Sequence, residues 1–104
     1  MTRIKIDLAV SMRGGAEDAT TALRVLANED RLLLLCELCG AGERSVGDLE
    51  TKLDIRQPTL SQQLSVLRRE GMVRTRRSGR QILYSVADVR LRALLRALHA
   101  VYCR

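Results

Sequence analysis

The 104-residue sequence has no phenylalanine, no tryptophan and only two tyrosines. Proteins that bind single-stranded nucleic acids usually stack the bases on several aromatic side chains. The scarcity of aromatic residues therefore argues against a single-strand binder, and it leaves duplex DNA as the better-suited nucleic acid.

The sequence also lacks a long apolar run, since the longest, Leu32 to Cys36, has five residues. A membrane-spanning helix needs about 20 apolar residues, and the N-terminus shows neither the apolar stretch nor the cleavage site of a signal peptide. We therefore expect a cytoplasmic protein without a membrane partner, whose three cysteines are thiols at rest.

Groups that carry catalysis are scarce as well. The chain has a single histidine, and it shows no histidine with a catalytic partner, no paired carboxylates at a readable site and no glycine-rich phosphate loop. We expect that the protein is not an enzyme and that it needs no cofactor.

What the sequence does contain is a local excess of positive charge. The net charge is +6, and residues 68–80 alone carry six arginines and one glutamate. A basic segment of this kind suggests an anionic partner, although a solvated basic face is the plain alternative.

Apolar periodicity predicts a mainly α protein with one β-hairpin. Residues 1–15 are expected to form a loose arm, in part helical, and residues 16–104 a single domain. The predicted elements are helices over residues 17–27, 31–39 and 46–53, a helix opened by Gln57-Pro58 and stopped by Gly71, strands over 72–76 and 81–86 joined by Ser78-Gly79, and a last helix up to Tyr102. Four helices, a hairpin and a last helix are the order of a winged helix-turn-helix.

Capping residues support these boundaries. Asn28 is expected to end the first helix in the left-handed conformation, while Asp30 caps the second helix and Gly40 terminates it. Ser45 to Asp48 is a capping box for the third helix, and Asp88 caps the last one.

The helix pair joined by the short turn at residues 54–56 predicts a helix-turn-helix, whose second helix enters the major groove. Its polar side carries no carboxylate to repel phosphate and is rich in hydrogen-bonding groups suited to base edges and phosphates. These candidate DNA contacts are Gln57, Thr59, Ser61, Gln62, Gln63, Ser65 and Arg68. An ordinary polar helix face is the alternative.

The predicted hairpin carries an arginine cluster around its turn, namely Arg74, Arg76, Arg77 and Arg80. An arginine-tipped hairpin beside a recognition helix is typical of a wing that reaches phosphates or the minor groove. We expect these residues to contact duplex DNA as well.

At this point the chain resembles the ArsR/SmtB family of winged-helix repressors over roughly residues 19–103. The resemblance is carried by residues 22–27 (ALRVLA), 45–49 (SVGDL) and above all 57–67 (QPTLSQQLSVL), with residues 71–84 similar to the family's wing. It implies a repressor that binds near-palindromic operators and releases them when an inducer binds.

The resemblance also implies a symmetric homodimer built from the first and last helices. The last helix has an apolar stripe for this purpose, with small Ala93, Ala97 and Ala100 that allow close approach. The expected interface residues are Leu23, Leu91, Leu94, Leu95, Leu98 and Tyr102.

Two metal sites of the family are missing from the sequence. Residues 45–47 (SVG) replace a Cys-Val-Cys pattern, and the last helix offers only Asp88 and His99 where a zinc-binding subgroup has an Asp and at least two His. One histidine per chain does not supply that tetrahedral site, so no metal is expected there.

The cysteines instead resemble the BigR/SqrR/HlyU-type subgroup of persulfide sensors, in which one thiol lies in the second helix and one at the end of the last. The strings RLLLLC, ending at Cys36, and AVYC, ending at Cys103, carry this resemblance. It implies that reactive sulfur species link Cys36 to Cys103 through a disulfide or polysulfide and thereby release DNA. Cys39 departs from the pattern.

Three alternatives stay open at this point. Cys36, Cys39 and Cys103 together offer a three-thiolate site for arsenite or another soft ion. The second alternative is that all three cysteines are buried structural thiols and that the regulator has a different ligand or none. The third alternative is that the chain is an interaction module that has this fold but does not bind DNA.

Overall fold

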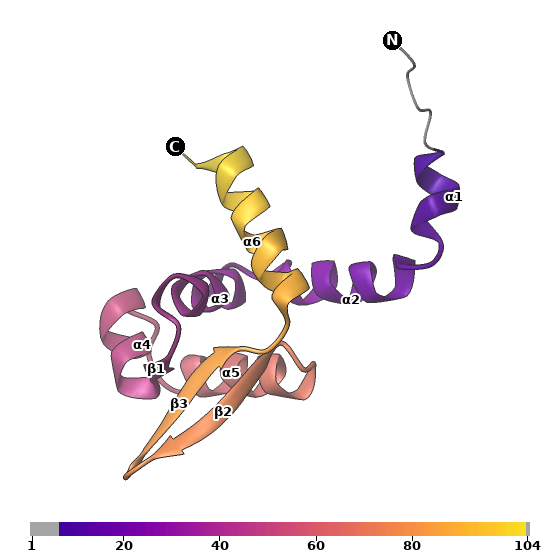
Figure 1. The fold of residues 1–104 in the computed structure, drawn as a ribbon. Coiled ribbons are helices and arrows are strands. Elements are labelled where there is room, and N and C mark those ends of the chain that lie inside the picture. The colour runs from indigo at the N-terminus through magenta and orange to yellow at the C-terminus, as the bar shows by residue number, and fades with distance from the viewer. Residues whose placement is uncertain (1–6, 104) are drawn as a thin grey trace.

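A computed structural model of the chain describes residues 7–103 (Figure 1). Its elements in chain order are α1 (Leu8–Met12), α2 (Ala16–Leu26), α3 (Glu29–Ala41), β1 (Arg44–Ser45), α4 (Val46–Leu53), α5 (Thr59–Arg69), β2 (Val73–Ser78), β3 (Gln81–Val86) and α6 (Val89–Tyr102). The predicted winged helix-turn-helix is confirmed, and α1 and β1 are additions to the expected order. No helix within these residues is long and apolar enough to cross a bilayer.

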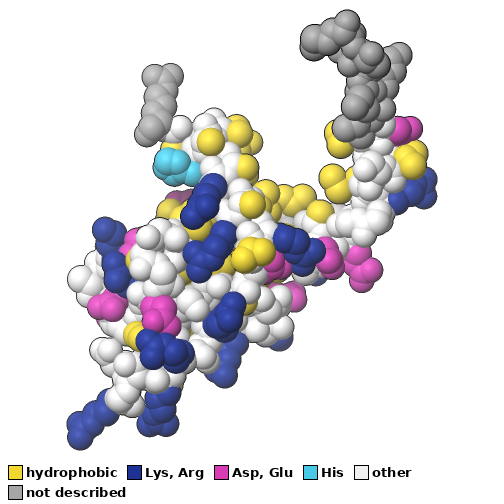
Figure 2. All heavy atoms as spheres, in the orientation of Figure 1, with side chains coloured by type: hydrophobic (Ala, Val, Ile, Leu, Met, Phe, Trp, Pro, Cys, Tyr) yellow, Lys and Arg dark blue, Asp and Glu magenta, His cyan; other side chains and the backbone are white. Residues whose placement is uncertain are grey.

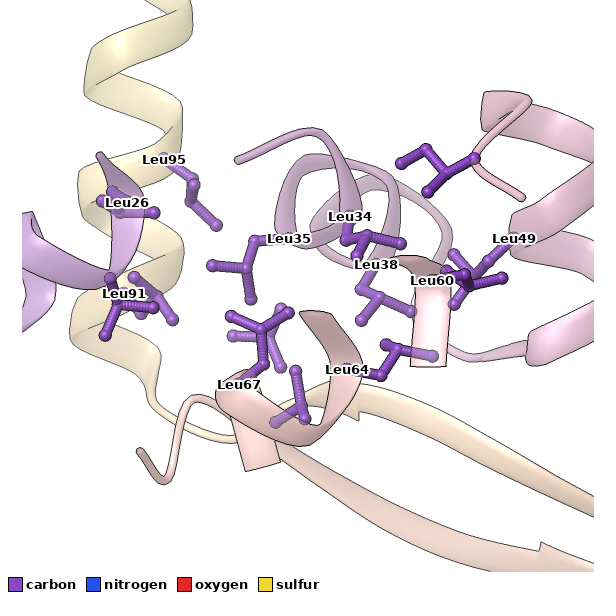
Figure 3. Packing of buried hydrophobic residues seen from close by; sticks show 14 residues of the cluster. Leu26, Leu34, Leu35, Leu38, Leu49, Leu60, Leu64, Leu67, Leu91 and Leu95 are labelled. Carbon is purple, nitrogen blue, oxygen red and sulfur yellow. The ribbon is translucent and has the colours of Figure 1, made fainter. Parts of the chain in front are cut away.

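Helix α3 lies at the centre of the core and contacts α2, α4, α5, α6 and β3. Its Leu34, Leu35 and Leu38 have no exposed surface, and they face leucines of α5 and α6 (Figure 3). Burying a leucine side chain contributes about 1.5 to 3 kcal/mol. The leucine-rich helix α3 therefore packs against both α5 and the last helix, α6.

The helix-turn-helix consists of α4 and α5 joined by residues 54–58. Helix α4 begins with the predicted capping box, since the Ser45 hydroxyl accepts from the Asp48 amide at 3.2 Å and the Asp48 carboxylate accepts from the Ser45 amide at 3.3 Å. It ends at Asp54, which has a left-handed backbone with φ of 55°. These local features set the direction in which the chain enters α5.

Substitution Ser45→Ala is expected to lower the free energy of unfolding by about 0.5 to 2 kcal/mol, because α4 loses its N-terminal cap. Urea unfolding at fixed protein concentration measures this. Thr51→Ala, at an exposed position within the same helix, is the matched control and should change stability far less. Equal losses in both variants would contradict the assignment of Ser45 as the cap.

The three strands form one antiparallel sheet in the order β1-β3-β2. In the hairpin, Val73 pairs with Val86 and Ser78 with Gln81, so Gly79 and Arg80 form the turn. Gly79 has a φ of 61°, the left-handed conformation that the predicted Ser-Gly turn requires. The hairpin projects away from the helices beside α5 (Figure 1).

Several predicted boundaries are wrong. Asn28 is extended and caps α3 by accepting from the Arg31 amide at 3.0 Å, so it does not end α2, and Asp30 lies in the first turn of α3 instead of capping it. Gly40 lies inside α3, and Gly42, with a φ of 93°, follows its end. Ala27 ends α2 in place of Asn28, Asn28 caps α3 in place of Asp30, and Gly42 ends α3 in place of Gly40.

The N-terminal segment was expected to be a loose arm, in part helical. Residues 8–12 form the short helix α1, which stands away from the body of the molecule (Figure 1). Residues 1–6 and 104 lie outside the described part of the chain.

Candidate DNA interface and thiol cluster

Helix α5 presents the predicted polar side to solvent, because Leu60, Leu64 and Leu67 turn its other side into the core. Of the predicted contacts, Gln57, Ser61, Gln62, Ser65 and Arg68 are exposed, while Thr59 and Gln63 are half-buried. The helix begins at Thr59, and Pro58 occupies its capping position.

Two glutamines near the start of α5 already have partners within the protein. The side-chain oxygen of Gln57 accepts from the Ser61 amide at 3.1 Å and from its hydroxyl at 2.6 Å. That of Gln63 accepts from the Arg31 guanidinium at 3.0 Å. Sequence reasoning missed Arg31, since nothing local in the chain links it to a residue 32 positions away.

The arginines of the hairpin are all exposed, and positively charged side chains gather at its tip (Figure 2). Their surroundings differ. Arg74 donates to the Ala87 carbonyl at 3.1 Å and Arg77 to the Gly79 carbonyl at 3.3 Å, whereas Arg76 is paired with Glu43.

The Arg76–Glu43 pair links β2 to the loop before β1. Two guanidinium nitrogens of Arg76 donate to the two carboxylate oxygens of Glu43, at 3.0 and 2.8 Å. This hydrogen bonding lowers the pKa of Glu43 below its usual value. Glu43 therefore stays ionised near neutral pH and occupies Arg76, a contact that the sequence pattern did not signal.

Substitution Glu43→Gln is expected to strengthen binding to duplex DNA and to make the slope of log affinity against log salt steeper by about one. The reason is that Arg76 becomes available to a phosphate. Fluorescence anisotropy between about 50 and 200 mM salt measures both quantities. Glu17→Gln makes the same charge change on exposed α2 and serves as the control. An unchanged slope would mean that Arg76 does not contact DNA.

The three thiols belong to α3 and to the end of α6. Cys36 and Cys103 are exposed and Cys39 is half-buried. Partial burial raises the pKa of Cys36, and the charges of Cys39 and Cys103 raise it further. Arg92 of α6 also donates to the Cys39 carbonyl at 3.4 Å, which joins the two helices beside the thiols.

The alternative three-thiolate metal site is not assembled. Within residues 7–103, no three His, Cys, Asp or Glu side chains are placed to hold a metal ion together. Since i and i+3 positions bring only Cys36 and Cys39 onto one face of α3, the third thiol would have to come from another helix.

The expected interface residues fall into two groups. Leu91 and Leu95 are only 4% and 2% exposed, so they belong to the core of the single chain, and little of their surface remains for a second copy. Leu94 and Leu98 are half-buried against that core. Leu23 and Tyr102 are exposed by 54% and 80%.

A helix-turn-helix with a polar reading face, flanked by an arginine-tipped hairpin, defines a winged helix-turn-helix DNA-binding protein. The family model described as "Bacterial regulatory protein, arsR family" matches residues 28–75, from Asn28 at the start of α3 to the first half of β2. The chain belongs to this ArsR family, as its sequence pattern predicted.

Relatives agree with this assignment. The chain is 50% identical to the biofilm growth-associated repressor of Agrobacterium fabrum over 93 residues, which cover 89% of this chain and 79% of the relative. It is similar to the crystal structure of the transcriptional repressor BigR from Xylella fastidiosa, with a TM-score of 0.86, 42% identity and coverage of 92% and 97%.

A structure of reduced HlyU from Vibrio cholerae is also similar, with a TM-score of 0.81, 37% identity and coverage of 90% and 98%. The predicted BigR and HlyU subgroup is thereby confirmed, and the protein is a DNA-binding transcriptional regulator.

Proposed function

We propose that this regulator is a repressor that leaves its operator when reactive sulfur species link Cys36 to Cys103. The observation that carries the proposal is the pair of exposed thiols on α3 and at the end of α6, two helices that pack against each other. Its similarity to HlyU, a relative whose structure was solved in a reduced form, supports thiol chemistry.

The first attack is assigned to Cys103. A thiolate is the attacking species, and the raised pKa of Cys36 leaves little thiolate on that residue at neutral pH. Cys103 lies exposed at the end of α6, where a small donor can approach it. Cys36 then acts as the resolving thiol.

The chemistry balances without an additional oxidant. The Cys103 thiolate attacks the outer sulfur of a persulfide R–S–SH, which forms Cys103–S–SH and releases RS⁻. The Cys36 thiolate attacks the Cys103 sulfur, closes the disulfide and releases HS⁻. With a donor R–S–S–S–R, two displacements at the central sulfur release two RS⁻ and leave a bridge of three sulfurs.

Bridge length offers selectivity between donors. A plain disulfide requires α-carbons about 4.4 to 6.8 Å apart. A reduced pair held slightly further apart would resist ordinary oxidants and accept a bridge of three or four sulfurs.

The link would act on DNA binding through α3. This helix contacts both α6 and α5, and its Leu34, Leu35 and Leu38 are packed without exposed surface. A close-packed core passes on a displacement instead of absorbing it. A bridge that pulls α6 toward α3 is thus expected to shift α5 and the wing relative to the operator.

We also propose that the working form is a homodimer that binds DNA through α5 and the wing. Large apolar side chains are exposed on α1, α2 and α6, and a single chain leaves them without cover. These residues are Leu8, Val10, Met12, Leu23, Val89, Val101 and Tyr102. Sedimentation equilibrium should give a particle of two chains, and a stable monomer of 11.7 kDa would contradict this part of the proposal.

The experiment that tests the inducer uses intact-mass spectrometry with binding measured in parallel. The probe is a duplex selected from random sequence by the reduced protein. A persulfide donor should yield a Cys36–Cys103 link and release the duplex, while arsenite should leave the complex intact. A stoichiometric arsenic adduct that releases DNA, with no effect of the persulfide, would overturn the proposal.

A further inference from the structure

The side chain of Arg31 connects three helices next to the DNA-reading face. From the first turn of α3 its Nε donates to the Val25 carbonyl at 2.7 Å and one terminal nitrogen approaches the Arg24 carbonyl at 3.5 Å, both at the end of α2. Its other terminal nitrogen donates to Oε1 of Gln63 on α5 at 3.0 Å. The guanidinium is thus held on one side by α2 while it holds Gln63 on the other.

This contact fixes which way the Gln63 amide faces. Arginine has five N–H donors and no acceptor, so only the oxygen of a glutamine amide can bond to it. The amide NH₂ of Gln63 therefore points away from Arg31. Because Gln63 is half-buried and Arg31 is anchored by backbone carbonyls, reversing the amide would leave donors facing donors.

The orientation limits what Gln63 can recognise. A glutamine reads adenine at two points, with its NH₂ donating to N7 and its oxygen accepting from the N6 amino group. The Gln63 oxygen faces Arg31 on the protein side of this half-buried side chain, so the half of the amide that turns outward is the NH₂ donor. An outward donor alone bonds to phosphate oxygens or to a single base acceptor, such as N7 of a purine or O4 of thymine, and it does not read the N6 amino group of adenine.

The neighbouring Gln62 is in a different situation. It is exposed, and among residues 7–103 its side-chain amide has no hydrogen-bond partner within the protein. Both its oxygen and its NH₂ can turn toward one base. Two adjacent residues of the same type thus differ in chemistry because one of them is held by Arg31.

We propose that Arg31 is a positioning residue that makes Gln63 a donor-only contact and leaves Gln62 as the residue of this pair that reads adenine at two points. The proposal rests on the proposed role of α5 in reading the operator. It does not depend on the identity of the inducer.

The test replaces each adenine of the selected duplex, one at a time, by purine, which lacks the N6 amino group. The adenine read by Gln62 should show a loss of affinity on this replacement, and Gln62→Ala should remove that loss. Gln62→Ala itself should weaken binding to the unmodified duplex by about 5- to 150-fold, the range of one bidentate base contact.

Gln63→Glu is the matched variant, since a carboxylate oxygen still accepts from Arg31 while the outward donor is lost. It should weaken binding by about 2- to 12-fold, the range for one lost hydrogen bond. The loss of affinity caused by each purine replacement should remain as in the unmodified protein. If Gln63→Glu removes the purine effect, or Gln62→Ala leaves it in place, the proposal is overturned.

Arg31→Lys tests the positioning role directly. A single ammonium cannot hold the α2 carbonyls and Gln63 in the fork geometry of the guanidinium, so the Gln63 amide becomes able to turn. We expect a broader base preference at the position next to Gln63, with binding to non-specific duplex unchanged. An unchanged base preference would reject the role of Arg31, and a general loss of binding with a lowered Tm would show that it is only structural.

Failure of the proposed function can be distinguished from failure of this proposal. If the reduced protein selects no duplex, the DNA-binding part of the proposed function fails and this proposal fails with it. If selection succeeds and persulfide has no effect on binding, the proposed inducer alone is wrong and the contacts of Gln62 and Gln63 stand.

Discussion

Replacing Cys36 by serine is expected to leave DNA binding by the reduced protein intact and to abolish its loss on treatment with a persulfide. In the unmodified protein the link should weaken binding by about 5- to 150-fold, the usual range for coupling between two sites. The serine variant cannot complete the bridge from α6 to α3, so its affinity should not change. Fluorescence anisotropy before and after treatment measures the DNA affinity of the unmodified protein and of the variant.

Cys103→Ser should behave in the same way, while Cys39→Ser is the control that retains the proposed pair. Mass spectrometry distinguishes Cys36→Ser from Cys103→Ser. With Cys103 present and Cys36 replaced, the donor should leave a persulfide on Cys103, because the first attack still takes place. Loss of the response in Cys39→Ser alone would assign the second thiol of the switch to Cys39 instead.

Substitution Leu34→Ala is expected to lower the free energy of unfolding by about 2 to 5 kcal/mol, since the side chain is fully buried in the core around α3. A domain of this size has little stability in excess of that. Much of the protein should then be unfolded near physiological temperature. Urea unfolding followed by circular dichroism, at one protein concentration, measures the change.

Leu33→Ala is the matched control for this measurement. Leu33 is the preceding residue of the same helix, with the same side chain and helix propensity, but it is 40% exposed. Its replacement should cost about 1 kcal/mol or less. Similar losses at both positions would contradict the placement of Leu34 at the centre of the core.

The sequence predicted much of the local structure because helices, caps and turns depend on residues a few positions apart. The leucines at positions 60, 64 and 67 marked the buried side of α5, and the Ser45–Asp48 capping box, the turn at Gly79 and the Asp88 cap are present as expected. Where two nearby residues can both end or cap a helix, as Asn28 and Asp30 or Gly40 and Gly42 can, local rules did not decide between them.

What the sequence alone determined was the class of the protein: its helical order, its polar reading face, its basic wing and its family. The tertiary structure decided which of the candidate side chains are available. It placed Leu91 and Leu95 in the core, paired β1 with β3, joined Arg76 to Glu43 over 33 residues and turned the Gln63 oxygen toward Arg31 over 32. Contacts between residues so far apart depend on how whole helices and strands pack, and no local pattern encodes that packing.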